Sequence, residues 1–164
     1  FSDFARMPKP IFKKINLNKV ISRSLNLLKV SEKNITFNLT VNNSDLSIKG
    51  DEEQINRVFI NLIKNSIESI YEKKRKNAIF KGKINVDIKE DSDYIYVEIK
   101  DNGIGFDGVN KAKMLTPYYT TKTKGTGLGL SIVTKIINDH NSTILFNSIK
   151  DGAQVEIAIP KYYD

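Results

Sequence analysis

The sequence lacks several residues on which catalytic and metal-binding sites often depend. It contains no cysteine, which excludes disulfide bonds, thiol nucleophiles and cysteine-bound metal ions. Its single histidine, His140, excludes a polyhistidine metal site. No apolar run approaches the roughly 18 residues of a membrane-spanning helix, so we expect no span and no signal peptide within these residues.

The charge of the chain is basic but evenly spread. The 164 residues fit one domain, and their formal net charge is +7. Such charge can attract nucleic acid, an anionic membrane or a phosphorylated ligand. However, the main cluster, Lys73–Lys76, ends an expected helix, where positive charge complements the helix dipole. We therefore expect no nucleic-acid partner.

Glycine is concentrated in two short segments. Five of the nine glycines lie in Asp101-Asn102-Gly103-Ile104-Gly105 and in Gly125-Thr126-Gly127-Leu128-Gly129-Leu130. A glycine-rich loop that opens a helix binds anions, because its free N–H groups and the helix dipole favour negative charge. Between the segments runs a basic, aromatic stretch, Pro117–Lys124. Together these features indicate a nucleotide site.

Hydrophobic periodicity predicts an α+β fold. Helical spacing covers residues 18–30, a long stretch after Asp51, and 128–138. Strands are expected at 11–15, at 35–41 with a short partner around Leu46 and Ile48, and at 84–90, 94–100, 143–149 and 153–159. Asp51 is a plausible N-cap, with Gln54 completing a capping box. We predict a two-layer α/β sandwich with a mixed, mostly antiparallel sheet and helices on one face.

Two asparagines of the long helix are candidate ligands. Asn61, Asn65 and Glu68 fall within about 60° of one another at about 100° per residue, on the shoulder of the apolar face. Asn65 could offer its carbonyl oxygen to Mg²⁺, which prefers oxygen ligands. Ordinary polar surface is the alternative interpretation.

Asp101 and the second glycine segment suggest opposite ends of a nucleotide. Asp101 ends a strand at a sharp turn, where its carboxylate could accept a hydrogen bond from the adenine amine or merely cap the turn. The backbone of Gly125–Gly129 could cradle phosphate, although no Lys-Ser/Thr follows as in a P-loop. Lys122 and Lys124 are either flexible phosphate donors or solvated loop residues. For His140 we expect a structural role near a helix C-terminus.

With these residues in place, the chain resembles the catalytic ATP-binding domain of bacterial sensor histidine kinases, of the Bergerat-fold (GHKL) superfamily. The resemblance covers about residues 11–160 and four motifs in order. These are an N box at Asn61–Ser69, a G1 box at Asp101–Gly105, an F box at Pro117–Lys122 with tyrosines where phenylalanine is common, and a G2 box at Gly125–Leu130. Asp151-Gly152-Ala153 matches the last glycine element more weakly. Residues 1–8, with Lys124, are similar to the NtrY branch of nitrogen-type sensor kinases.

The resemblance implies a role for each motif. Asn65 would coordinate Mg²⁺ with Asn61 assisting, Asp101 would bind the adenine amine, and Gly103 and Gly105 would line the base pocket. Lys122 would hold the triphosphate together with the backbone of five residues: Gly125, Thr126, Gly127, Leu128 and Gly129. Residues 106–124 would form a lid over ATP, and 1–10 would be the end of an upstream dimerisation helix and a linker to the catalytic domain, 11–164.

Two departures from the family pattern bear on the chemistry. ATP-hydrolysing relatives carry a glutamate as water base four residues before the magnesium asparagine, where this chain has Asn61, which favours phosphoryl transfer over hydrolysis. Some sensor kinases carry a lysine at the position of Glu68, and that lysine contacts phosphate. This chain lacks the lysine, so we do not expect that contact here. The resemblance places the phosphoacceptor histidine upstream of this sequence.

The resemblance thus implies a protein histidine kinase that uses ATP and Mg²⁺. Its partners would be the upstream dimerisation and phosphoacceptor domain and a response regulator of the nitrogen type. It implies a cytoplasmic domain and allows a parent protein anchored in the inner membrane. The alternatives are a GHKL-type protein-serine kinase and a non-catalytic nucleotide-sensing module.

Overall fold

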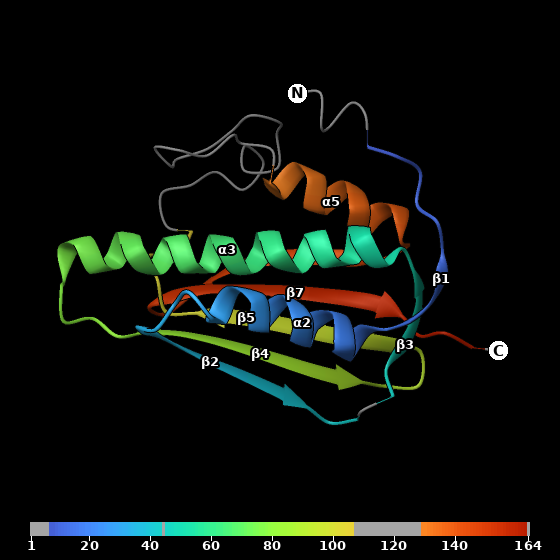
Figure 1. The fold of residues 1–164 in the computed structure, drawn as a ribbon, viewed down its shortest axis with the longest axis horizontal. Coiled ribbons are helices and arrows are strands. Elements are labelled where there is room, and N and C mark those ends of the chain that lie inside the picture. The colour runs from blue at the N-terminus through green and yellow to red at the C-terminus, as the bar shows by residue number, and fades with distance from the viewer. Residues whose placement is uncertain (1–6, 44, 107–128, 164) are drawn as a thin grey trace.

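The domain is a sandwich of one main sheet and one layer of helices (Figure 1). The computed structural model describes residues 7–43, 45–106 and 129–163. Within them, α3 (Glu52–Lys76) packs against both α2 (Leu17–Lys29) and α5 (Gly129–Asp139), and all three cover one face of the sheet. The predicted two-layer α/β sandwich with helices on one face is confirmed.

Five strands form the main sheet in the order β2-β4-β5-β7-β6. Their bounds are Ile35–Val41, Gly82–Glu90, Tyr94–Asp101, Gly152–Pro160 and Thr143–Ile149. β2 runs parallel to β4, and the other three pairings are antiparallel. The expected mixed, mostly antiparallel sheet is therefore observed, with strand ends within two residues of those predicted.

The short strand expected at Leu46 and Ile48 exists, but its partner is not the strand that precedes it. β3 (Ser47–Gly50) pairs with β1 (Lys13–Asn16) in a separate two-stranded antiparallel sheet. Its other side receives a hydrogen bond from the C-terminal segment, from Tyr162 N to Ser47 O at 2.9 Å. Alternation identifies a strand and its buried face, whereas tertiary packing decides which strand lies beside it.

The long helix α3 forms the centre of the core. Its buried apolar residues recur at helical spacing: Ile55, Val58, Phe59, Leu62, Ile63, Ile67 and Ile70. Full burial of each such side chain stabilises the fold by roughly 1.5–3 kcal/mol. Glu52 and Glu53 in the first turn and Lys73–Lys76 in the last complement the helix dipole.

The predicted capping box at the start of α3 is only half formed. Asp51 Oδ1 accepts a hydrogen bond from Gln54 N at 3.1 Å, as an N-cap should. The Gln54 side chain does not return to the backbone of Asp51, however; it donates to Pro8 O at 3.0 Å. The Asp51 N–H instead donates to His140 Nε2 at 3.0 Å.

Candidate nucleotide-binding site

The Asp101 carboxylate lies buried where β5 ends beneath the helices. Alternate residues of β5 face the helix layer, and Asp101 belongs to that set with an exposed fraction of 8%. Its Oδ1 accepts a hydrogen bond from Gly103 N at 2.9 Å, so the local cap anticipated from the sequence is present. The Ser66 hydroxyl and the Ala153 N–H also donate to this carboxylate.

These surroundings act on the pKa of Asp101 in opposite directions. Burial raises the pKa, because the charged form loses solvation, and this is the dominant effect. The hydrogen bonds from Gly103, Ser66 and Ala153, and the positive charge of Lys73, lower it. A carboxylate offers about four lone-pair sites. Three donors leave this one with room for another hydrogen bond.

Asn102 fixes the turn after β5 to the start of β4. Its Oδ1 accepts from Lys83 N at 2.7 Å, and its Nδ2 donates to Lys81 O at 3.0 Å. From α3, Lys73 Nζ donates to Asn102 O at 3.0 Å. Lys73 therefore serves the turn as well as the helix dipole. The sequence showed only that asparagine suits a turn; these long-range partners could not be read from it.

The glycines of the first segment allow the turn to pass between α3 and β7. A Cβ at Gly103 would lie 2.3 Å from Ser69 Oγ and 2.6 Å from Ser69 C. Gly105 has φ +74°, and its Cβ would lie 2.6 Å from Gly152 O. A Cβ at Gly152 would lie 1.9 Å from Asp101 O. These glycines therefore have a packing role that the motif did not reveal, and their place in a base pocket stays a prediction.

The candidate asparagines of α3 lie on the same helix as Ser66, which donates a hydrogen bond to Asp101. Asn61 and Asn65 are half-buried and Glu68 is exposed, which fits the predicted shoulder of the apolar face. Asn65 directly precedes Ser66, whose hydroxyl reaches Asp101. The helix thus brings the candidate magnesium ligand and the candidate adenine acceptor into one region.

The donor set suits magnesium that is held mainly by phosphates. Among the described residues, no group of three His, Cys, Asp or Glu side chains could form a metal site. Mg²⁺ is commonly held through one or two protein oxygens together with substrate phosphates and waters. The amide oxygen of Asn65 fits that requirement.

Helix α5 begins at the last glycine of the second segment. Apart from its chain neighbours and its own helix backbone, no heavy atom of the described residues lies within 4 Å of the position that a Cβ of Gly129 would take. Lys122, Lys124 and residues 125–128 lie outside the described residues, as does the expected lid after Phe106. The Phe106 ring itself packs edge-on against Phe146, with centroids 6.0 Å apart.

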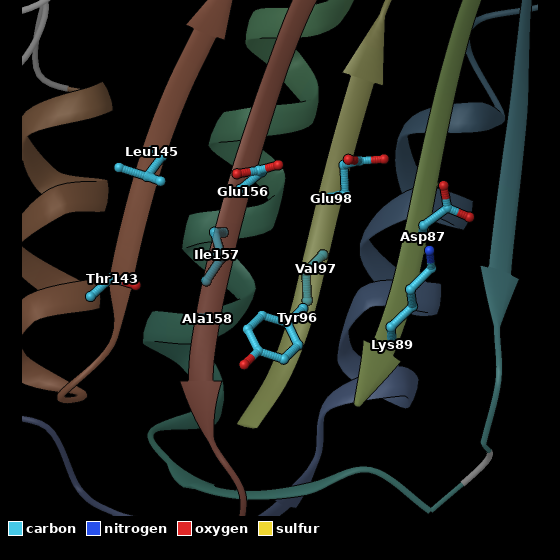
Figure 2. Close-up of a pocket in the computed structure, with 10 residues that line it drawn as sticks. All are labelled: Asp87, Lys89, Tyr96, Val97, Glu98, Thr143, Leu145, Glu156, Ile157 and Ala158. Carbon is cyan, nitrogen blue, oxygen red and sulfur yellow. The ribbon is translucent and has the colours of Figure 1, made fainter. Parts of the chain in front are cut away.

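A shallow depression of about 350 Å³ lies on the opposite face of the sheet (Figure 2). Side chains of β4, β5, β6 and β7 line it, among them Tyr96, Leu145 and the carboxylates Asp87, Glu98 and Glu156, which neighbour one another in register. Because Asp101 faces the helices, the sheet separates this depression from it. The depression is therefore not part of the candidate nucleotide site.

Comparison with known proteins gives consistent matches. Residues 50–163 match the family model described as histidine kinase-, DNA gyrase B- and HSP90-like ATPase. The nitrogen regulation protein NtrY of Azorhizobium caulinodans is 32% identical over 152 residues, which are 93% of this chain and 20% of that protein. Sporulation kinase B of Bacillus subtilis is 40% identical over 117 residues, 71% of this chain and 26% of that protein. The chain thus spans about a fifth to a quarter of these relatives.

Solved structures agree in fold over nearly the whole chain. The nucleotide-free catalytic domain of histidine kinase ThkA has a TM-score of 0.79 and 32% identity, covering 92% of this chain and 96% of that one. ThkA in complex with the response regulator protein TrrA has a TM-score of 0.77 and 28% identity, covering 93% and 42%. No helix in the described part of this chain is long and apolar enough to cross a bilayer.

Proposed function

Because this chain belongs to the family of histidine kinase-, DNA gyrase B- and HSP90-like ATPases, we propose that it binds Mg-ATP and transfers the γ-phosphoryl group to a histidine. Its relatives over most of its length are sensor histidine kinases, and it is the ATP-binding catalytic part of such a kinase. The acceptor histidine belongs to an upstream domain. The observation that carries the proposal is the buried Asp101 carboxylate, which α3 flanks with Ser66 and Asn65.

Asp101 would recognise the adenine. Gly103, Ser66 and Ala153 hold its carboxylate in one orientation, and the remaining acceptor site would accept a hydrogen bond from the exocyclic amine. A buried acceptor discriminates strongly, because a base that offers no donor there leaves the carboxylate without its partner.

The phosphates would lie between α3 and the start of α5. Asn65 offers an oxygen to Mg²⁺, which neutralises phosphate charge when bound. The backbone N–H groups of the first turn of α5 would point toward the anion, and by motif Lys122, Lys124 and the backbone of 125–128 would contribute further donors. These groups orient the γ-phosphoryl, so that the acceptor nitrogen forms its bond to phosphorus as the bond to ADP breaks.

Other parts of the proposal concern the longer protein. The phosphorylated histidine would pass its phosphoryl group to a response regulator of the nitrogen type, as the NtrY-like relatives suggest. The domain would work in the cytoplasm, where ATP is supplied, and an inner-membrane anchor would belong to the parent protein.

The proposed function is tested by mixing this chain with the phosphoacceptor domain of its parent and γ-labelled ATP. Acid-labile label on histidine is expected, whereas ATP binding without transfer would favour a nucleotide-sensing module.

Replacing Asp101 by asparagine should weaken ATP binding by about ten- to a hundredfold, equivalent to roughly 1.4–2.8 kcal/mol. The amide presents an NH₂ group to the adenine amine or to the Ala153 N–H, and either contact is repulsive. The variant should remain folded, because burial raises the pKa of Asp101 and the ionised carboxylate therefore destabilises the native state above that pKa. Calorimetric titration with ATP measures the effect. Equal ATP affinity in variant and parent would remove Asp101 from the base site.

Introducing glutamate at position 61 should divert phosphoryl groups to water. Asn61 is half-buried on α3, one helical turn before Asn65, and its amide cannot take a proton from water. A carboxylate there can act as a general base, which typically contributes 10²–10⁴-fold, so release of inorganic phosphate should rise at least about tenfold. The Asn61→Gln variant, which adds length but no base, is the matched control. The same increase in Asn61→Gln would contradict the assignment of position 61.

A further inference from the structure

Residues 7–12, here called the linker segment, are attached to the N-terminal end of α3. Gln54 Nε2 donates to Pro8 O at 3.0 Å, and Ile11 N donates to Asp51 Oδ2 at 2.8 Å. Met7 packs against the hydrophobic core. The segment is therefore held by the side chains of Gln54 on α3 and of Asp51, the N-cap of that helix, before it enters β1.

Asp51 connects the linker segment to the end of α5. Its two carboxylate oxygens cap α3 and hold Ile11, while its backbone N–H donates to His140 Nε2 at 3.0 Å. Because Nε2 accepts this bond, the hydrogen-bond pattern assigns the proton of the neutral ring to Nδ1, which donates to Ile136 O at 2.7 Å. Phe12 of the segment stacks edge-on against the same ring, with centroids 5.1 Å apart.

His140 therefore has the structural role expected from the sequence, for a different reason. It is buried, with an exposed fraction of 4%, and it joins two backbones as a neutral ring. The predicted reason was attraction of a positive imidazole to a helix C-terminus. The neighbouring backbone N–H makes the neutral ring the better partner.

The burial and hydrogen bonding of Gln54 indicate that its amide serves to contact the linker segment. Its side chain is buried, with an exposed fraction of 6%, and its Oε1 has no hydrogen-bond partner among the described residues. A buried, unpaired amide oxygen destabilises a protein. An apolar side chain of the same size would fill this position better if packing were its only role. The bond from Nε2 to Pro8 O is what the amide contributes.

We propose that Asp51, Gln54 and His140 are positioning residues for phosphoryl transfer, which set the direction in which the linker segment leaves the catalytic domain. This inference rests on the proposed function, because it takes the segment to be the connection to the phosphoacceptor domain. In-line transfer requires the acceptor atom to be placed closely, and a displacement of about 1 Å can cost on the order of 10²-fold in rate. The same contacts anchor the end of α5, the helix whose first residue is Gly129 at the proposed phosphate site.

The sharpest test replaces Gln54 by methionine in the parent protein and in this chain. Methionine keeps the length of the side chain, removes the bond to Pro8 and also removes the unpaired oxygen. The melting temperature should therefore stay unchanged, and the Kd for ATP should stay within about twofold of that of the unmodified protein. The rate of histidine phosphorylation should fall by about ten- to a hundredfold. The Ile11 amide proton reports the attachment directly, and it should exchange with solvent at least about tenfold faster in the variant.

Two further variants and the contrary outcomes complete the test. Glu53→Gln alters an exposed neighbour in the same helical turn and should change none of these quantities, whereas Phe12→Ala should resemble Gln54→Met. Unchanged phosphorylation in a Gln54→Met protein whose Ile11 amide has lost protection would overturn the positioning role alone. An Ile11 amide unprotected in the unmodified parent would also overturn it. A parent that phosphorylates no histidine would refute the proposed function, and the positioning role with it.

Discussion

Alanine at position 103 should lower the free energy of unfolding of the domain by about 3 kcal/mol, at the upper end of the usual cost of overpacking. The new Cβ would meet Ser69 Oγ at 2.3 Å, Ser69 C at 2.6 Å and Ile70 N at 2.8 Å. The hydroxyl could rotate away, but the other two atoms belong to the backbone of α3 and cannot yield. The turn must therefore move, and the hydrogen bond from Ile104 N to Ser69 Oγ at 2.9 Å is lost. Urea denaturation followed by far-UV circular dichroism measures the change.

Gly129 is the matched control for this substitution. Apart from its chain neighbours and its own helix backbone, no heavy atom of the described residues lies within 4 Å of the position of its Cβ, and alanine forms helices better than glycine. Gly129→Ala should leave stability equal or slightly higher, while ATP affinity falls if the start of α5 binds phosphate. Equal stability losses in the two variants would mean that the loss at position 103 does not come from its close contacts with Ser69 and Ile70.

Alanine at position 65 should strongly reduce magnesium-dependent phosphoryl transfer while the fold is kept. Histidine phosphorylation should fall by about 10²–10³-fold, the usual cost of removing one electrostatic contact to a transition state. The side chain is half-buried in the middle of α3, where alanine is a better helix former than asparagine. ATP titrations with Mg²⁺ and with a chelator separate the effects: the gain in affinity that Mg²⁺ gives the unmodified chain should disappear in the variant.

Asn26 of α2 provides the comparison for Asn65. It is exposed, and Asn26→Ala makes the same change of residue type in another helix. Its magnesium response and its phosphorylation rate should match the parent. A normal magnesium response in Asn65→Ala would move the metal ligand elsewhere, whereas a loss of helical signal would mean that Asn65 supports α3.

The fold was predictable where a local pattern determines it. The apolar residues of α3 repeat at helical spacing and the strands alternate, so both layers follow from the sequence. The pairing of β3 with β1 does not, because alternation carries no information about the neighbouring strand. The return half of the predicted capping box, from Gln54 to the Asp51 backbone, is absent for a similar reason. Gln54 and the Asp51 N–H both found partners, Pro8 and His140, that lie far away in the sequence.

The candidate site residues could be picked out from the sequence, but the contacts that hold them in place could not. Asp101, Asn65 and the glycines stand out by residue type and spacing. Ser66 and Asn102 act through contacts made only when α3, β4 and β5 are assembled. Gly103 shows the limit most clearly: the motif suggested a surface for a base, and the position of its absent Cβ is filled by α3.

The order of the strands also determines when the site can form. β5 lies between β4 and β7, and Asp101 pairs with Ala153, which follows it by 52 positions. During synthesis, the strand containing Ala153 must therefore leave the ribosome before the Ala153 N–H can donate its hydrogen bond to Asp101. Pairing across such a separation also makes folding slower than local pairing does. A nascent chain should consequently acquire affinity for nucleotide only when β7 has emerged, after its helices have formed.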